Sequence, residues 1–255
     1  LFAKFTQTNH AQTRWQQAEN EPMAEYKNPF SNRKHYHEHA EWIDDHLSKF
    51  FDDKLVSVFH EIPTLDLHLD VYLIKPENSS FNILLTSGMS TLKMNVDEQA
   101  ENLKDLEFAE LMMLIPKTIE FGQIYSGENK NDWIISILKR TAKFPHFYDT
   151  WIGIGHTIQA EEDLTPYATD TDFVGALILP SVTFDKDFTE INKNGRKINI
   201  YNVLPLYKNE MEFKIENGYS KLLDLLIKAN GKEVLDLNRK NLISKKSVWN
   251  RIFKN

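Results

Sequence analysis

The chain has 255 residues, of which 41% are hydrophobic and 26% charged. These proportions are typical of a globular protein and not of a disordered or fibrous one. It contains no cysteine, which excludes a disulfide framework, a thiolate nucleophile and a cysteine-ligated zinc site. A reducing compartment fits this composition, so we expect a cytoplasmic protein. No apolar run approaches the roughly 20 residues of a membrane-spanning helix, and we expect no membrane span.

The charge is unevenly distributed along the chain. From Arg239 onward there are six basic residues and no acidic one, so the formal charge of −7 leaves −13 for the rest of the chain. An acidic body repels nucleic acid and attracts basic partners, and it raises the rate of encounter more than the final affinity. We therefore expect a protein partner and no nucleic acid. Solubility alone is the alternative explanation of this charge.

The first half of the chain contains two clear patterns. Residues 1–30 are polar and lack a sustained period, which predicts an irregular N-terminal arm. From Ser31 onward the apolar residues recur every three or four positions through Ile43 and Leu47, which predicts a helix. Strict alternation over residues 65–74 predicts a strand. A polar turn then leads to residues 81–86, so we expect an antiparallel hairpin.

The second half alternates between strand and helix patterns. Residues 108–115 fit either a strand or a helix, and Pro145 should end a helix that begins near Asn131. Further strands are expected at residues 154–158, 174–179 and 198–204, and helices at residues 211–213 and 219–229. This order predicts an α/β (mixed α+β) fold, a single domain with a mixed, largely antiparallel sheet covered by helices. We place that domain at residues 31–230 and a basic C-terminal helix or tail at residues 231–255.

Two polar clusters resemble metal or catalytic sites. His35, His37 and His39 lie on the first predicted helix, but no His-Glu-x-x-His motif occurs, so we interpret them as part of an exposed helix face. On the alternating strand, His68 would lie between Asp66 and Asp70, which favours its protonated form. The preferred interpretation is again the polar side of a half-exposed strand.

Two short motifs also lack the features that catalysis or cofactor binding requires. Residues 86–89 (Thr-Ser-Gly-Met) lack the Gly-x-Ser-x-Gly elbow that would expose a nucleophilic serine. Residues 153–156 (Gly-Ile-Gly-His) are too short for a dinucleotide-binding fingerprint. We expect no catalytic residue, no cofactor and no bound metal.

Several short blocks stand out along the chain. They are residues 59–61 (Phe-His-Glu), 85–90 (Leu-Thr-Ser-Gly-Met-Ser) with Met94, 109–112 (Ala-Glu-Leu-Met), 114–116 (Leu-Ile-Pro), 151–156 (Trp-Ile-Gly-Ile-Gly-His), and 201–207 (Tyr-Asn-Val-Leu-Pro-Leu-Tyr) with Glu210, Met211 and Gly218. In this order the blocks resemble the Suppressor of fused domain. The resemblance covers roughly residues 36–229. Within it, Gly88 is expected to need a positive φ.

The resemblance implies a non-enzymatic protein-binding domain. Lysine outnumbers arginine by 24 to 6, which suggests an AT-rich bacterial genome. Bacterial members of the family resemble immunity proteins that neutralise a toxin, such as a nuclease, by direct binding. Eukaryotic members resemble adaptors that hold an extended peptide of a regulatory protein, and this remains an alternative. A metal-dependent hydrolase that uses His60, His146 and His156 is a third hypothesis.

Two groups of residues are candidates for partner binding. The first comprises polar residues of the family blocks, namely His60, Glu61, Glu110, His156 and Glu210. The second comprises acidic clusters that would face a basic cleft, namely Glu161, Glu162, Asp163, Asp170 and Asp172. The alternative role of the first group is structural, because buried polar atoms must be hydrogen-bonded.

Overall fold

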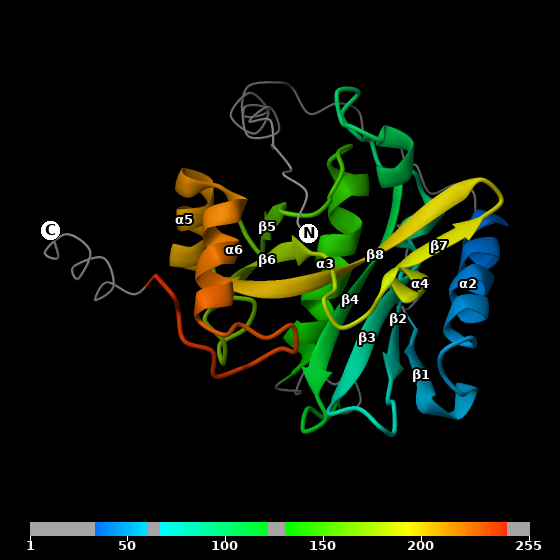
Figure 1. Cartoon of the computed structure of the whole chain (residues 1–255), viewed down its shortest axis with the longest axis horizontal. Coiled ribbons are helices and arrows are strands. Elements are labelled where there is room, and N and C mark those ends of the chain that lie inside the picture. The colour runs from blue at the N-terminus through cyan, green and yellow to red at the C-terminus, as the bar shows by residue number, and fades with distance from the viewer. Residues whose placement is uncertain (1–33, 61–66, 122–130, 244–255) are drawn as a thin grey trace, which may run out of the picture. The chain divides into compact units, whose positions relative to one another are not determined.

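The computed structural model describes residues 34–60, 67–121 and 131–243. From Arg33 onward the chain forms one compact unit built on an eight-stranded sheet (Figure 1). The strands are β1 (Val56–Phe59), β2 (Asp70–Ile74), β3 (Phe81–Ser87), β4 (Phe108–Pro116), β5 (Thr157–Gln159), β6 (Phe173–Leu179), β7 (Glu190–Lys193) and β8 (Arg196–Tyr207). The α-helices are α2 (Lys34–Leu47), α3 (Asp132–Phe147), α4 (Lys186–Thr189), α5 (Lys208–Asn217) and α6 (Tyr219–Lys228).

The sheet has the order β1-β2-β3-β4-β8-β6-β5, and β7 pairs with β8 beside this path. The β4–β8 pair is parallel and the other pairs are antiparallel. The expected hairpin is present, because β2 pairs with β3 from Asp70 opposite Ser87 to Ile74 opposite Ile83. The predicted mixed, largely antiparallel sheet is therefore confirmed.

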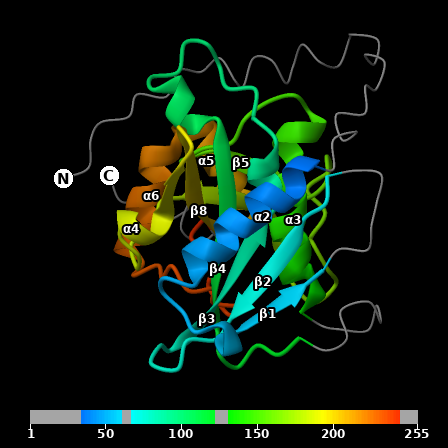
Figure 2. The same cartoon turned by 90° about the vertical axis from the view of Figure 1, so that its right-hand side faces the viewer.

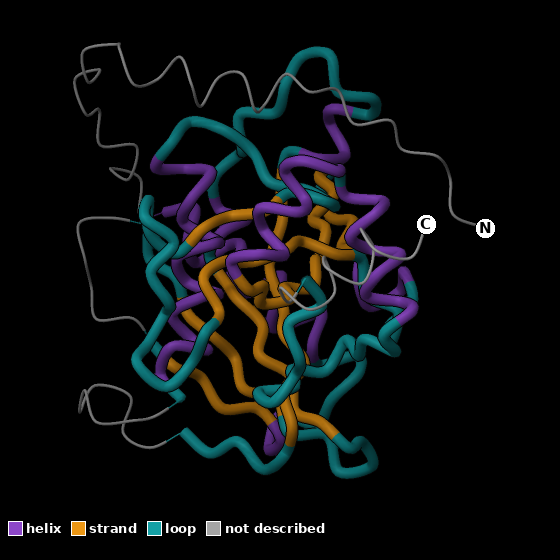
Figure 3. The backbone as a smooth tube through the Cα atoms, turned by 90° about the vertical axis from the view of Figure 1, so that its left-hand side faces the viewer, coloured by secondary structure: helices purple, strands orange, loops and turns teal. Residues whose placement is uncertain are grey.

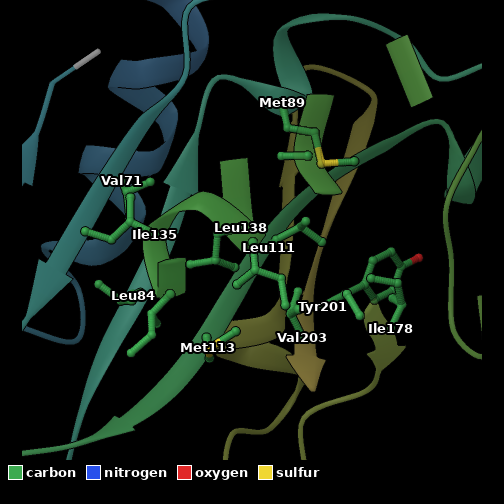
Figure 4. Close-up of a cluster of buried hydrophobic side chains, with 14 of the residues drawn as sticks. Val71, Leu84, Met89, Leu111, Met113, Ile135, Leu138, Ile178, Tyr201 and Val203 are labelled. Atoms are coloured by element: carbon green, nitrogen blue, oxygen red, sulfur yellow. The ribbon is translucent and has the colours of Figure 1, made fainter. Parts of the chain in front are cut away.

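Helices cover both faces of the sheet (Figures 2 and 3). Since side chains alternate along a strand, β8 serves both faces. Tyr201 and Val203 pack with α3 in the largest core cluster, which Figure 4 shows. Ile198 and Ile200 pack with α2 and α4 on the other face. Farther along that face, Leu204 and its neighbours pack against α5 and α6.

The sequence analysis left one element open, misplaced the end of a second and missed a third. The ambiguous segment from Phe108 is a strand, paired on both sides. Pro145 lies inside α3, which continues to Phe147, so the expected end of this helix was wrong by a few residues. The hairpin of β7 and β8 was not predicted, because β7 is short and polar.

The burial of the polar face of β2 requires a larger correction. The sequence alternation predicted a half-exposed strand, but every residue of β2 is buried. The polar residues Asp70 and Tyr72 are only 5% and 7% exposed, because α2 and its cluster cover the face that was expected to contact water. Local alternation reports side-chain type and does not report what packs above the strand.

The segment after α6 packs against the sheet. Val234 forms an isolated parallel bridge with Leu114, and the backbone N–H of Leu235 donates to the carbonyl of Leu114 at 2.7 Å. The side chain of Leu235 is 3% exposed and belongs to the largest core cluster.

Among the described residues, no helix is both long enough and apolar enough to cross a bilayer.

Candidate functional site

Glu110 organises the loop that follows β3. It lies on β4 with a fully buried side chain, and its carboxylate accepts hydrogen bonds from Thr86 Oγ1 (2.6 Å), Gly88 N (3.1 Å), Ser90 N (2.9 Å) and Ser90 Oγ (2.6 Å). Burial raises the pKa of Glu110, and the hydrogen bonds from Ser90, Thr86 and Gly88 act in the opposite direction. This carboxylate therefore fixes a loop inside the fold and does not face solvent.

Gly88 has the positive φ that the sequence predicted, at 129°. A Cβ atom at this position would lie 2.3 Å from the carbonyl oxygen of His68. Only glycine fits such a close approach of two backbone segments. The loop from Thr86 to Ser90 is thus held from one side by Glu110 and packed on the other side against the start of β2.

The corner of the sheet where β2 begins and β3 ends also holds a buried carboxylate between two imidazoles. Asp70 Oδ2 lies 3.1 Å from His60 Nδ1, and Asp70 Oδ1 lies 3.1 Å from His68 Nε2. The sequence analysis had instead expected one imidazole between Asp66 and Asp70. Asp66 and the candidate Glu61 lie outside the described residues, and the side chain of His60 is exposed.

His146 of α3 also lies at this corner. The sequence analysis considered it only as a catalytic candidate and did not predict this structural contact. Its Nε2 atom lies 3.0 Å from the carbonyl oxygen of Met89, and burial lowers its pKa to about 4. Three family blocks meet at this corner: His60 of residues 59–61 contacts Asp70, and Glu110 of residues 109–112 accepts hydrogen bonds from residues 86–90. Sequence order alone does not place them together.

His156 lies elsewhere, in the loop before β5. Its ring contacts the Trp151 ring with centroids 4.4 Å apart. Its backbone carbonyl accepts from Ile178 N at 2.9 Å. Burial and the nearby positive charge of Lys214 lower its pKa to about 4, so the imidazole is neutral near pH 7.

Glu210 connects α5 to the C-terminal segment. Its side chain is fully buried and forms two hydrogen bonds with the Arg239 guanidinium, at 2.6 and 2.8 Å. It also accepts from the backbone of Tyr207 (3.2 Å) and Leu242 (3.0 Å). Arg239 stacks over the Tyr207 ring at 4.9 Å. Sequence reasoning missed the role of Arg239, which it counted only among the six basic residues of the predicted C-terminal helix or tail.

The five acidic candidates lie together on one surface loop. Residues 160–172, the acidic loop, connect β5 to β6, contain five acidic side chains and have no lysine or arginine. All five carboxylates are exposed. Glu161 pairs with Arg140 of α3 at 2.5 Å. Hydrogen bonds from the hydroxyl and backbone N–H of Thr165 lower the pKa of Asp163.

The histidines of the first predicted helix give no metal site that can be described. The side chains of His35, His37 and His39 lie outside the described set, and His46 is buried with Nε2 2.8 Å from the carbonyl oxygen of Phe188. In the part of the chain that the structure describes, no three metal-ligating side chains gather in one place.

The geometry thus defines a mixed α/β scaffold that uses Glu110, His156 and Glu210 internally and exposes five carboxylates on the acidic loop. The sequence profile of the Suppressor of fused protein (SUFU) family matches residues 66–240. This range is more than half of the chain, and the chain belongs to the SUFU family. The predicted family is confirmed.

Two solved structures share this fold. A SUFU homologue from Neisseria gonorrhoeae is 15% identical with a TM-score of 0.58, and the match covers 82% of this chain and 99% of that chain. A chain of the Sufu–Fu complex is 13% identical with a TM-score of 0.54, over 83% of this chain and 96% of that chain. No curated protein sequence gives a significant match.

Proposed function

We propose that this chain is a protein-binding domain that neutralises a cognate bacterial toxin by direct contact, with the acidic loop as its main contact surface. Membership of the SUFU family supports a binding role, and a similar fold occurs in a complex of Sufu with Fu. The similar fold of a bacterial homologue supports the bacterial setting.

The observation that carries the proposal is the arrangement of the acidic loop. Five exposed carboxylates within thirteen residues produce a concentrated negative field. A basic cleft, such as the one a nuclease uses for its substrate, is the complementary surface, and opposite fields steer two such proteins together. This contact requires neither a nucleophile nor a cofactor.

The polar residues of the family blocks support binding over catalysis. Glu110 and Glu210 are fully buried and bonded within the fold. The three histidines of the hydrolase hypothesis have separate neighbours: His60 contacts Asp70, His146 contacts Met89 and His156 contacts Trp151. Buried groups that are satisfied in this way stabilise loops and helix ends.

The adaptor alternative rests on a different feature, the end of the sheet. The three-residue strand β5 (Thr157–Gln159) is the last strand in the sheet order. An extended peptide binds such an edge through its backbone, so that affinity depends on main-chain hydrogen bonds more than on charge. The two roles therefore differ in their dependence on salt and on loop charge.

The experiment is capture of protein partners from the source cells on the immobilised chain, with mass spectrometry of what elutes. The test variant carries Glu162→Gln, Asp170→Asn and Asp172→Asn, and the control carries Glu77→Gln, Glu98→Gln and Glu101→Gln, three exposed acids elsewhere. Both variants lose three negative charges. We expect wild type and control to capture the same polypeptide and the test variant to lose most of it. Equal capture by all three contradicts the role of the loop.

A further inference from the structure

Three of the nine glycines follow an asparagine, and the three pairs have different surroundings. Residues 194–195 form the turn between β7 and β8, whereas residues 217–218 and 230–231 lie at the ends of α5 and α6. In an Asn-Gly pair the backbone nitrogen of the glycine can attack the side-chain amide of the asparagine, because glycine has no Cβ atom that blocks the approach. The surroundings decide which of the three pairs can react.

The glycine nitrogen is already bonded at both helix ends. Gly218 N and Gly231 N each donate to a backbone carbonyl of the preceding helix at 2.8 Å. The side chain of Asn217 is also held, because its Nδ2 atom donates to the carbonyl of Phe213 at 3.0 Å. The attacking nitrogen must first lose its proton, so the hydrogen bond of each glycine has to break before the reaction.

The turn between β7 and β8 lacks both restraints. Asn194 and Gly195 are exposed and have positive φ, at 52° and 74°, and Lys193 pairs with Arg196 across the turn. In the part of the chain that the structure describes, no group bonds to the Gly195 N–H or to the Asn194 amide. A Cβ atom at Gly195 would meet nothing within 4 Å. The turn is therefore surrounded by open space.

The hairpin that carries this turn can open at its tip. β7 has four residues, and β8 is its only strand partner among the described residues. A short strand that is paired on one side opens locally at low cost in free energy. Such opening lets the side chain of Asn194 rotate toward the nitrogen of Gly195.

Positive charge beside the turn favours the same reaction. Lys193 and Arg196 are the cross-strand pair next to it, and Asp45 offsets part of the Lys193 charge at 2.8 Å. The attacking nitrogen is negative once it has lost its proton, and nearby cations stabilise an anion. Asn217 instead follows Glu216, whose carboxylate has the opposite effect.

We infer that Asn194 is a modification site, which the folded chain converts without an enzyme to aspartate and isoaspartate. The Gly195 nitrogen gives its proton to hydroxide and forms a bond to Cγ of Asn194. The bond between Cγ and Nδ2 breaks, and the amide nitrogen takes a proton from water and leaves as ammonia. Water then opens the succinimide ring at one of its two carbonyls, which gives aspartate or isoaspartate and adds one negative charge to the chain.

The isoaspartate product changes the hairpin itself. Its backbone runs through the former side chain and adds one carbon to a turn of only two residues, so the tight-turn geometry is lost. The register of β7 with β8 then loosens, and with it the ion pair of Lys193 with Asp45 of α2 and the packing of Ile191, which is 5% exposed. We expect the isoaspartate form to be less stable than the unmodified chain.

The test follows all three asparagines in one sample. The wild-type chain is kept at mildly alkaline pH, and the acid formed at each site is measured over time by proteolysis and mass spectrometry. We expect Asn194 to react at least about fivefold faster than Asn217 and Asn230, since a hydrogen bond protects the glycine nitrogen at the other two sites. In the urea-unfolded chain all three nitrogens are free, and most of this difference should disappear. Equal rates in the folded chain, or the same excess of Asn194 in urea, contradict the inference.

A substitution in the turn gives an independent check. Gly195→Ala places a methyl group in open space but beside the attacking nitrogen. We expect this variant to slow the reaction of Asn194 at least about tenfold and to leave Asn217 and Asn230 unchanged. An unchanged rate at Asn194 overturns the inference.

The stability of the product is measured on the aged wild-type chain. Its modified fractions are separated from the unmodified chain by charge, and each is unfolded in urea. We expect the isoaspartate fraction to unfold at a lower urea concentration than the unmodified chain. Equal midpoints contradict the loosening of the hairpin.

Discussion

Single buried residues hold the corner at which three family blocks meet. Glu110 accepts four hydrogen bonds from Thr86 at the end of β3 and from Gly88 and Ser90 in the loop after it. Gly88 allows that loop to approach the backbone of His68. The sequence predicted the positive φ of Gly88, since the surrounding turn pattern requires it. It could not predict the partners of Glu110, because residues 20 and more positions away supply them.

Substitution of Gly88 tests this corner. A Cβ atom at Gly88 would lie 2.3 Å from the carbonyl oxygen of His68, whereas one at Gly195 would meet nothing within 4 Å, although both glycines have positive φ. We expect Gly88→Ala to lower the free energy of unfolding by about 3 kcal/mol or more. Gly195→Ala, the control, should cost about 1 kcal/mol. Urea denaturation measures both, and similar losses for the two variants would argue against the close approach.

The buried histidine of the corner predicts a dependence of stability on pH. The pKa of His146 falls from 6.5 to about 4 on folding, so between these values the unfolded state binds the extra proton. The stability that this group contributes is therefore complete above pH 6.5 and is lost as the pH falls toward 4. We expect His146→Gln to reduce the loss of unfolding free energy between pH 7 and pH 4 by about 3 kcal/mol. Parallel pH profiles for the variant and wild type would contradict this.

At the scale of elements, the sequence predicted the type of most helices and strands but not what covers them. The β2–β3 hairpin follows from local alternation and a polar turn. The burial of Tyr72 does not, because α2 lies above it and is distant in sequence. The β7–β8 hairpin had a signal that went unused: Asn194 and Gly195, both with positive φ, form a sequence typical of a tight hairpin turn.

The buried ion pair between Glu210 of α5 and Arg239 connects the C-terminal segment to α5. Removing one partner of a buried ion pair leaves the other charge uncompensated. We expect Arg239→Met to lower the unfolding free energy by about 3–5 kcal/mol, and the double variant Glu210→Gln, Arg239→Met to recover part of this loss. Lys240→Met, at an exposed neighbouring position, should change it by less than about 0.5 kcal/mol. If Arg239→Met behaves like this control, the segment is not tied to α5 by this pair.

At the scale of the whole molecule, the acidic loop exposes five carboxylates within thirteen residues. The sequence located the five acids of the acidic loop, because their spacing is local.

Growth of a host cell that produces the captured polypeptide tests the central claim most directly. The polypeptide is expressed alone, with the wild-type chain, and with the variant Glu162→Gln, Asp170→Asn, Asp172→Asn. The account predicts that the polypeptide alone stops growth, that the wild-type chain restores growth, and that the variant restores it poorly. A polypeptide that binds the chain but never inhibits growth, or that still inhibits growth beside the wild-type chain, would contradict neutralisation and favour the adaptor role.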